Sequence, residues 1–220
     1  MQLPSTFFGW VRFLLEQYGP LFLSGVGVTL IVAITGTLAG FLLGLLVAIL
    51  RTIPTSPKDP AVKRVPLKIL SWLLGVYIEV FRGTPMIVQA MVIYYGGMTV
   101  GVRLPVLTAA ILIVSVNTGA YMAEIIRGGI MGVDSGQMEA GRSLGLSYVT
   151  TMKDIVLPQA MKSALPALIN EMITLLKETS ICGYIGLNEL TRGGDIVRGI
   201  TFEAMFPLFT VAAIYLIMVL

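Results

Sequence analysis

The chain has 220 residues, of which 56% are hydrophobic and 12% are charged, and its mean hydropathy is +0.89. Soluble domains carry roughly 25% charged residues, so this composition excludes an ordinary soluble protein. The net charge of +3 comes from basic residues in the polar connections, which suits membrane topology better than nucleic-acid binding. The single cysteine excludes an intrachain disulfide, and the absence of histidine argues against a Cys/His zinc site.

The apolar runs predict an all-α membrane protein. A helix needs about 20 residues to cross the hydrocarbon core of a bilayer. The runs are continuous and do not alternate, which favours helices over a barrel. We therefore expect a polytopic fold with an N-terminal interfacial segment over residues 1–20 and one membrane domain over residues 21–220. The five predicted transmembrane helices are residues 21–50, 67–98, 104–126, 163–185 and 204–220.

The N-terminal segment is rich in aromatic residues. It also carries Arg12 and Glu16, and it lacks the basic start and apolar core of a cleaved signal peptide. We predict a helix in the membrane interface, with its aromatic rings at headgroup level. At the other end, the last predicted span is still apolar at Leu220, so we expect that further sequence or a disordered end follows it.

The first predicted span contains two overlapping GxxxG units, formed by Gly36, Gly40 and Gly44. This spacing lets a neighbouring helix approach closely. Packing within the subunit and a dimer seam both satisfy the pattern, and we favour packing within the subunit.

Basic residues predict the orientation in the membrane. Nine of them flank the first and third connections, against four on the other side. By the positive-inside rule, the first and third connections are cytosolic and the N-terminus is outside. The nine are Arg51, Lys58, Lys63, Arg64, Lys68, Arg127, Arg142, Lys153 and Lys162; the four are Arg12, Arg103, Arg192 and Arg198.

The third connection, residues 127–162, is long, polar and patterned as helix. Good helix formers follow Gly136, and Gly145 predicts the end of this helix. Ser147 or Thr150 predicts the cap of a second helix, which we expect Pro158 to interrupt. Such helices either pack only on their own spans or also dock a partner outside the membrane.

The spacing within this connection resembles a known signature. Glu139-Ala140-Gly141, three residues, Gly145, nine residues, Ile155, one residue and Leu157-Pro158 are similar to the EAA signature of ABC-importer permeases. The departure is Gly141, where the signature usually has alanine. In that family the segment forms the coupling helix, which sits in a groove of the ATPase subunit. The resemblance implies an ATPase-coupling role for Glu139, Ala140, Gly141, Gly145, Leu157 and Pro158.

Other blocks resemble one branch of this family, the polar-amino-acid permeases. They are residues 81–89, 117–130, 165–171 and 176–180, and the resemblance covers about residues 20–220. It implies a type I ABC importer in a bacterial inner membrane, with two permease subunits, either identical or sister chains. It also implies two ATPase subunits that bind ATP and Mg, an external amino-acid-binding protein and an amino acid as substrate.

The sequence lacks the motif that an ATPase needs to bind ATP, which agrees with this resemblance to a permease subunit. The sequence contains no G-x-x-x-x-G-K-[ST] loop to bind phosphates, so ATP energy must enter through a partner. We therefore expect a transport subunit and not an enzyme, with no cofactor or metal of its own. Closure of the ATPases would move the loop, and the attached spans would alternate between outward-open and inward-open states. Glu139 is our candidate for a polar contact between the loop and the ATPase. Its carboxylate lies in the first turn of the predicted helix, so it also stabilises that helix through the helix dipole.

Ionisable groups at membrane depth are costly and usually functional. Lys177 lies about 21 Å along the fourth predicted span and Glu171 about 12 Å along it, while Glu79 lies about 18 Å along the second. Asn117 lies midway in the third span. These groups predict a substrate pathway in the central third of the bilayer. The candidate residues are Glu79, Thr84, Asn117, Glu171, Lys177 and Glu178.

The chemistry of the candidates suits an amino acid. Lys177 could bind its carboxylate, and Glu79, Glu171 or Asn117 its ammonium group, with a second carboxylate for a basic side chain. Alternatively, Lys177 only neutralises a buried carboxylate. Thr84-Pro85 is expected to interrupt the second span, either as a packing kink or as a substrate contact.

Near the cytosolic end of the third span, Glu124 and Arg127 are three residues apart, and we predict that they form an ion pair on the helix surface or anchor the loop.

The predicted function is a permease subunit of an ATP-driven importer for polar amino acids, with a basic amino acid among the candidates. The alternatives are an ion-coupled secondary transporter, with Glu79 or Glu171 as the proton carrier, and a channel or structural membrane subunit. The sequence leaves open which amino acid is carried, whether this subunit binds it, and whether the permease pair is a homodimer.

Overall fold

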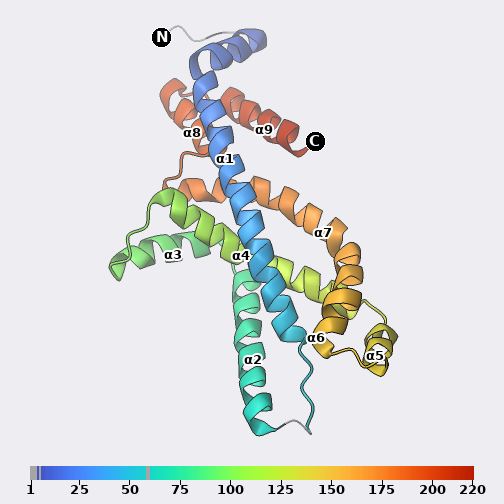
Figure 1. The fold of residues 1–220 in the computed structure, drawn as a ribbon. Helices are drawn as coiled ribbons and strands as arrows, with labels where there is room; N and C mark the ends of the chain where they lie inside the picture. The colour runs from blue at the N-terminus through green and yellow to red at the C-terminus, as the bar shows by residue number, and fades with distance from the viewer. Residues whose placement is uncertain (1–3, 5, 58–59) are drawn as a thin grey trace. The chain divides into compact units, whose positions relative to one another are not determined.

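The computed structural model describes residue 4, residues 6–57 and residues 60–220. Lys58, one of the basic residues counted above, lies outside them, as does the start of the predicted interfacial segment. Every regular element in the described residues is helical (Figure 1). The elements are α1 (Phe7–Thr52), α2 (Ala61–Gly83), α3 (Met86–Thr99), α4 (Val106–Met131), α5 (Ser135–Ser143), α6 (Tyr148–Thr151), the π-helical η1 (Met152–Val156), α7 (Leu157–Glu178), the 3₁₀-helical η2 (Thr179–Ile185), α8 (Leu190–Thr201) and α9 (Met205–Val219).

These elements form two compact units. The terminal unit comprises Met1–Gly36, Met86–Val114 and Ile173–Leu220, and the loop unit comprises Thr37–Pro85 and Ser115–Met172. The long helices α1, α4 and α7 contribute to both. The loop unit carries the whole third connection, whereas α8 and α9 belong to the terminal unit.

The five predicted spans each coincide with helical structure. Within the described residues, α1 and α4 are long and apolar enough to cross a membrane alone, and α2 with α3 makes a third candidate if the broken pair counts as one span. The fourth prediction begins six residues too late, since α7 starts at Leu157 and passes into η2. The fifth corresponds to α9, an apolar helix of 15 residues. The all-α polytopic fold is confirmed.

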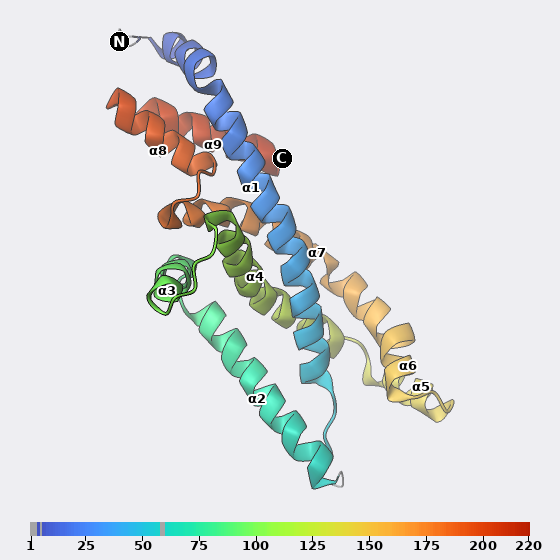
Figure 2. The same cartoon turned by 60° about the vertical axis from the view of Figure 1, so that its left-hand side comes forward.

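The predicted interfacial segment is continuous with the first span in a single helix of 46 residues. Figure 2 shows the N-terminal turns of α1 bent away from the rest of the helix. Pro20 lies inside α1, and proline is a usual cause of such bends because it removes a helical hydrogen bond. The placement of these turns in the membrane interface remains a prediction.

The glycine face of α1 packs on α4 in each unit. In the terminal unit, a Cβ on Gly36 would come 2.5 Å from Cγ1 of Val114. In the loop unit, a Cβ on Gly40 would come 2.9 Å from Thr118, and one on Gly44 would come 2.8 Å from Cβ of Met122. The GxxxG units therefore serve packing within the subunit, as predicted.

Helix α8 is an element that the sequence analysis did not predict. Its buried residues include Leu190, Gly194, Val197 and Thr201, which recur at helical spacing. A Cβ on Gly194 would come 2.6 Å from Cγ2 of Val211, so α8 and α9 lie in close contact.

Candidate functional site

The first helix of the polar loop is defined by local caps. The carboxylate of Asp134 accepts a hydrogen bond from the backbone N–H of Gly136 at 2.7 Å, and α5 starts there. At its other end Gly145 has a φ of +83°, and the backbone N–H of Leu146 donates to the carbonyl of Gly141 at 3.1 Å. This is a Schellman ending, which favours glycine at the left-handed position. The predicted stop at Gly145 is confirmed.

The second helix of the loop starts as predicted but does not stop where expected. The hydroxyl of Ser147 accepts from the backbone N–H of Thr150 at 3.1 Å and caps α6. The expected interruption at Pro158 is wrong, because the helix continues through the π turn η1 into α7. In this turn the N–H of Leu157 donates to the carbonyl of Met152, five residues back. The wider turn makes room for the proline ring, and proline is tolerated among the first residues of a helix.

Close packing joins α5 to α6. Gly141 is buried, and a Cβ there would come 2.5 Å from Cγ2 and 2.9 Å from Oγ1 of Thr151. The Thr151 side chain is itself fully buried, and its hydroxyl donates to the carbonyl of Ser147 at 2.9 Å. Thr151 therefore occupies the space that an alanine would need. This contact explains why glycine replaces the usual alanine of the signature.

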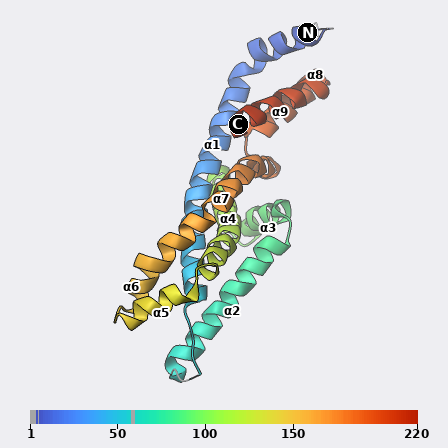
Figure 3. The same ribbon diagram turned by 90° about the vertical axis from the view of Figure 1, so that its right-hand side faces the viewer.

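The inner face of the loop is attached to the ends of its spans (Figure 3). The hydroxyl of Tyr148 in α6 donates to the carbonyl of Thr52 at the end of α1, at 3.2 Å. Burial raises the pKa of Tyr148, and the hydrogen bond to Thr52 opposes that rise. Beneath the loop, a Cβ on Gly129 would come 2.7 Å from the carbonyl of Ala160, which brings α4 and α7 together. The buried cluster under the loop comprises Ala48, Met122, Ile126, Ile130, Met152, Val156, Ala160, Ala164 and Leu168.

The outer face of the loop is open. Glu139 and Ala140 are exposed on α5. The apolar side chains of Leu144 and Val149 are 82% and 71% exposed. One face of the loop thus packs on its own spans and the other is exposed, and the docking of a partner on the exposed face remains a prediction. Of the remaining coupling candidates, Leu157 is half-buried against the cluster and Pro158 is exposed.

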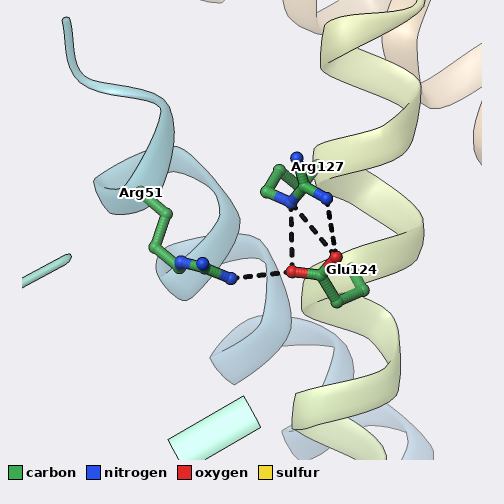
Figure 4. A network of polar contacts seen from close by, with 3 residues as sticks. All are labelled: Arg51, Glu124 and Arg127. Atoms are coloured by element: carbon green, nitrogen blue, oxygen red, sulfur yellow. Dashed lines mark hydrogen bonds and ion pairs between the residues drawn. The ribbon is translucent and has the colours of Figure 1, made fainter. Parts of the chain in front are cut away.

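Figure 4 shows a network of three charges at the end of α1. The predicted pair is confirmed, with Nη2 of Arg127 2.7 Å from Oε2 of Glu124. The sequence analysis missed the second partner, Arg51, whose Nη1 lies 2.7 Å from Oε1 of Glu124. The predicted topology places Arg51 and Glu124 at the same membrane surface, and this signal could have identified the pair. One carboxylate shared by two guanidinium groups leaves the network with a net positive charge.

The break after α2 is confirmed, and two pathway candidates lie at it. Pro85 has no N–H to donate to the carbonyl of Phe81, four residues earlier. The side-chain amide of Asn117 in α4 donates to that carbonyl at 3.3 Å. The hydroxyl of Thr84 donates to the carbonyl of Val80 at 2.7 Å. Asn117 therefore binds the carbonyl that Pro85 leaves free, and Thr84 binds back onto the last turn of α2.

The charged pathway candidates are divided between the two units. Glu79 is exposed on α2 and Glu171 is half-buried on α7, both in the loop unit. Lys177 is exposed and Glu178 is half-buried, both in the terminal unit. Their convergence on one pathway remains a prediction.

A buried carboxylate in the terminal unit was also missed. Glu189, only 1% exposed, caps α8 and accepts from the N–H groups of Thr191 and Arg192, each at 2.7 Å. The hydroxyl of Tyr215 in α9 donates to the same carboxylate at 3.2 Å. Burial raises the pKa of Glu189, and the backbone hydrogen bonds oppose that rise. A pocket of about 540 Å³ adjoins this residue.

Residues 60–220 match the family described as "Binding-protein-dependent transport system inner membrane component". The chain belongs to this family. It is 35% identical over 202 residues to the arginine transport system permease protein ArtQ of Bacillus subtilis, covering 91% of this chain and 87% of the relative. It is 36% identical over 207 residues to the glutamine transport system permease protein GlnP of Escherichia coli, with the same coverage of each chain.

Two solved structures share the fold. The crystal structure of an amino acid ABC transporter with histidines has a TM-score of 0.82 and 39% identity, and the match covers 98% of this chain and 93% of that chain. An inward-facing structure of the MetNI methionine ABC transporter has a TM-score of 0.74 over 90% of this chain and 89% of that one. At 24% identity, the second similarity shows the fold alone.

The family decides several questions that the residues left open. It is that of the membrane subunit, the permease, which pairs with a separate ATPase, so the chain is a transport subunit and not an enzyme. The resemblance stated from the EAA signature is confirmed. Neither a secondary transporter nor a channel finds support among the relatives. The family also implies an ATPase and a second permease subunit as partners, with ATP bound by the ATPase.

Proposed function

We propose that this chain is the permease subunit of an ATP-driven importer for polar amino acids, with a basic amino acid among the candidates. The observation that carries the proposal is the similarity to arginine and glutamine permeases over almost the whole of both chains. The crystal structure of an amino acid ABC transporter with histidines, which shares this fold at 39% identity, supports the same substrate class. The partners are a pair of ATPases, a second permease subunit and an external amino-acid-binding protein. The loop lies in the cytosol and the N-terminus outside, as the basic residues predict.

Coupling runs through the two faces of the loop. The outer face offers Leu144, Val149 and Glu139 to a groove of the ATPase. The inner face is packed on the ends of α1, α4 and α7, so a displacement of the loop moves three long helices together. Interiors this closely packed pass on a displacement because they cannot absorb it. The loop therefore transmits motion to the spans and performs no chemistry.

The pathway candidates have two kinds of role in this proposal. Lys177 binds the substrate carboxylate, and Glu79 or Glu171 binds its ammonium group, with Glu178 as a further carboxylate. Thr84 and Asn117 shape the break in α2 through their hydrogen bonds to its backbone carbonyls. Alternating access then requires the spans to swing between outward-open and inward-open states.

The test is uptake of radiolabelled arginine and glutamine into proteoliposomes containing the complete transporter. Glu139→Arg should lower ATP-driven uptake about tenfold, since a charge-assisted hydrogen bond is worth about 1.5–3 kcal/mol and each 1.4 kcal/mol is tenfold. Glu16→Arg is the matched control, because Glu16 is exposed and its surface ion pair with Arg12 contributes little. Unchanged uptake with Glu139→Arg would remove this residue from the joint. Uptake driven by a proton gradient without the ATPase would contradict the importer itself.

A further inference from the structure

A pocket of about 560 Å³ lies in the loop unit, between the end of α1 and α2. Its polar wall includes Lys68 and Ser71 of α2, which are three residues apart and lie on the same helix face as Gly75. Nη2 of Arg51 lies 3.6 Å from the position that a Cβ on Gly75 would take, so the guanidinium lies against this face. The other lining residues are Leu50, Ile53, Thr55, Leu67, Trp72, Val76 and Glu79.

One end of the pocket is positively charged. Arg51 and Lys68 line this end. The carboxylate of Glu124 contacts Arg51, but it is shared with Arg127 and so balances only one of the two guanidinium charges. Glu79 is the carboxylate among the lining residues, and it follows Lys68 by 11 residues, or about 16 Å along α2. Arg51, Lys68 and the Ser71 hydroxyl therefore suit an anion.

An apolar stripe continues from the pocket along α2. Ile69, Trp72 and Val76 recur at intervals of three and four residues, and all three are exposed, Trp72 by 66%. Tryptophan is typical of the interface between headgroups and hydrocarbon. A cationic pocket beside an apolar stripe matches the two parts of a phospholipid. Other exposed apolar residues of the same helix are Val62, Val65, Leu73 and Val80.

We propose that this pocket binds an anionic phospholipid, with the headgroup phosphate between Arg51 and Lys68 and the acyl chains along the stripe of α2. Guanidinium groups bind phosphate oxygens in bidentate fashion, and ammonium groups add a point charge. Basic pockets between membrane helices are known to select anionic headgroups. A lipid held here fixes the end of α1 through Arg51, next to Thr52, which accepts the hydrogen bond from the loop.

The test is a lipid titration of the purified full chain in detergent, followed by native mass spectrometry. The probes are phosphatidylglycerol and phosphatidylcholine of identical acyl chains. Lys68→Gln should weaken phosphatidylglycerol binding about tenfold, because it removes one charge-assisted contact to a lipid of net negative charge. It should weaken phosphatidylcholine binding less, because choline already neutralises the phosphate of that lipid. Gly75→Leu should have the same effect by filling the pocket, without a change of charge. Lys153→Gln is the control, since Lys153 is exposed on the loop and does not line the pocket.

Three results would overturn the proposal. They are equal binding of the two lipids by the wild-type chain, unchanged phosphatidylglycerol binding in both pocket variants, and displacement of phosphatidylglycerol by millimolar inorganic phosphate. The last result would identify a free-anion site. No ATPase, binding protein or amino acid is present, so failure here leaves the transport proposal intact, and failure of transport leaves this result standing.

Discussion

Two short helical connections differ in the way they are held to the long helices. In the polar loop, the caps of α5 and α6 are the exposed side chains of Asp134 and Ser147, and their hydrogen bonds go to residues two and three positions further along the chain. In α8, the cap is the buried carboxylate of Glu189, which also binds Tyr215 in α9. The next residue, Leu190, donates its N–H to the hydroxyl of Thr29 in α1 at 3.3 Å.

The difference separates a helix held by a buried polar network at its N-terminus from a helix pair held mainly by the packing of one face. Buried polar groups are costly unless satisfied, so the network at Glu189 fixes the start of α8. The loop is held instead by shape, through Gly141 against Thr151, and by one hydrogen bond from Tyr148. Its other face, with Leu144 and Val149, stays exposed. Such an arrangement suits a segment that must receive a partner and move with its spans.

Removal of the α8 cap should have the largest effect. Glu189→Ala leaves two backbone N–H groups and the Tyr215 hydroxyl without their buried acceptor. The two N–H groups are partly buried and lose their helix cap, at about 0.5–2 kcal/mol, and the Tyr215 hydroxyl loses a buried acceptor, at about 1–3 kcal/mol. We therefore expect a loss of about 2–4 kcal/mol, or roughly 5–15 °C in unfolding temperature. Thermal unfolding in detergent, followed by circular dichroism, measures this change. Glu139→Ala, at an exposed position, is the control, and equal midpoints for the two variants would show that the network does not fix α8.

A smaller effect is expected where shape holds the loop. Gly141→Ala forces Thr151 to move and should cost about 1–3 kcal/mol, the usual range for overpacking. Adding Thr151→Ala should restore part of the stability, because it frees the space that the new methyl group needs. Gly128→Ala is the control, since a Cβ at this helical glycine meets nothing within 4 Å. If Gly141→Ala and Gly128→Ala behave alike, the contact between α5 and α6 is not tight.

The same contrast shows which features could be predicted from the sequence. Gly145 and Ser147 act through their own backbone conformation and nearest neighbours, so local rules identified both ends correctly. The predicted interruption at Pro158 was wrong because a π turn accommodates the proline. In this turn the backbone hydrogen bond spans five residues instead of four, and no residue pattern in the sequence indicates this change. The hydrogen bonds at the start of α8 join Thr29, Glu189, Leu190 and Tyr215, and no local sequence pattern indicates contacts between residues so far apart in the chain.

The candidate site shows the same limit. The EAA spacing identified the loop, and the apolar runs identified the helices that carry it. Thr84 and Asn117 were predicted as polar residues at membrane depth, but the partner of Asn117 is the Phe81 carbonyl that Pro85 frees, and this contact joins two helices distant in sequence. Arg51 was counted only as a topology signal, because its pairing with Glu124 joins two helices distant in sequence.

The smallest effect tests the link between the loop and α1. Tyr148→Phe removes the hydrogen bond to the Thr52 carbonyl and keeps the packed ring, so it should cost only about 0.5–1.5 kcal/mol of stability. Coupling should suffer more than stability, because this bond connects α6 directly to the end of α1. The measurement is the ratio of substrate imported to ATP hydrolysed in proteoliposomes, with Tyr184→Phe, at an exposed tyrosine, as the control. A lower ratio in Tyr148→Phe alone supports transmission through this contact. A ratio equal to that of the control would mean that the packed inner face transmits the motion without it.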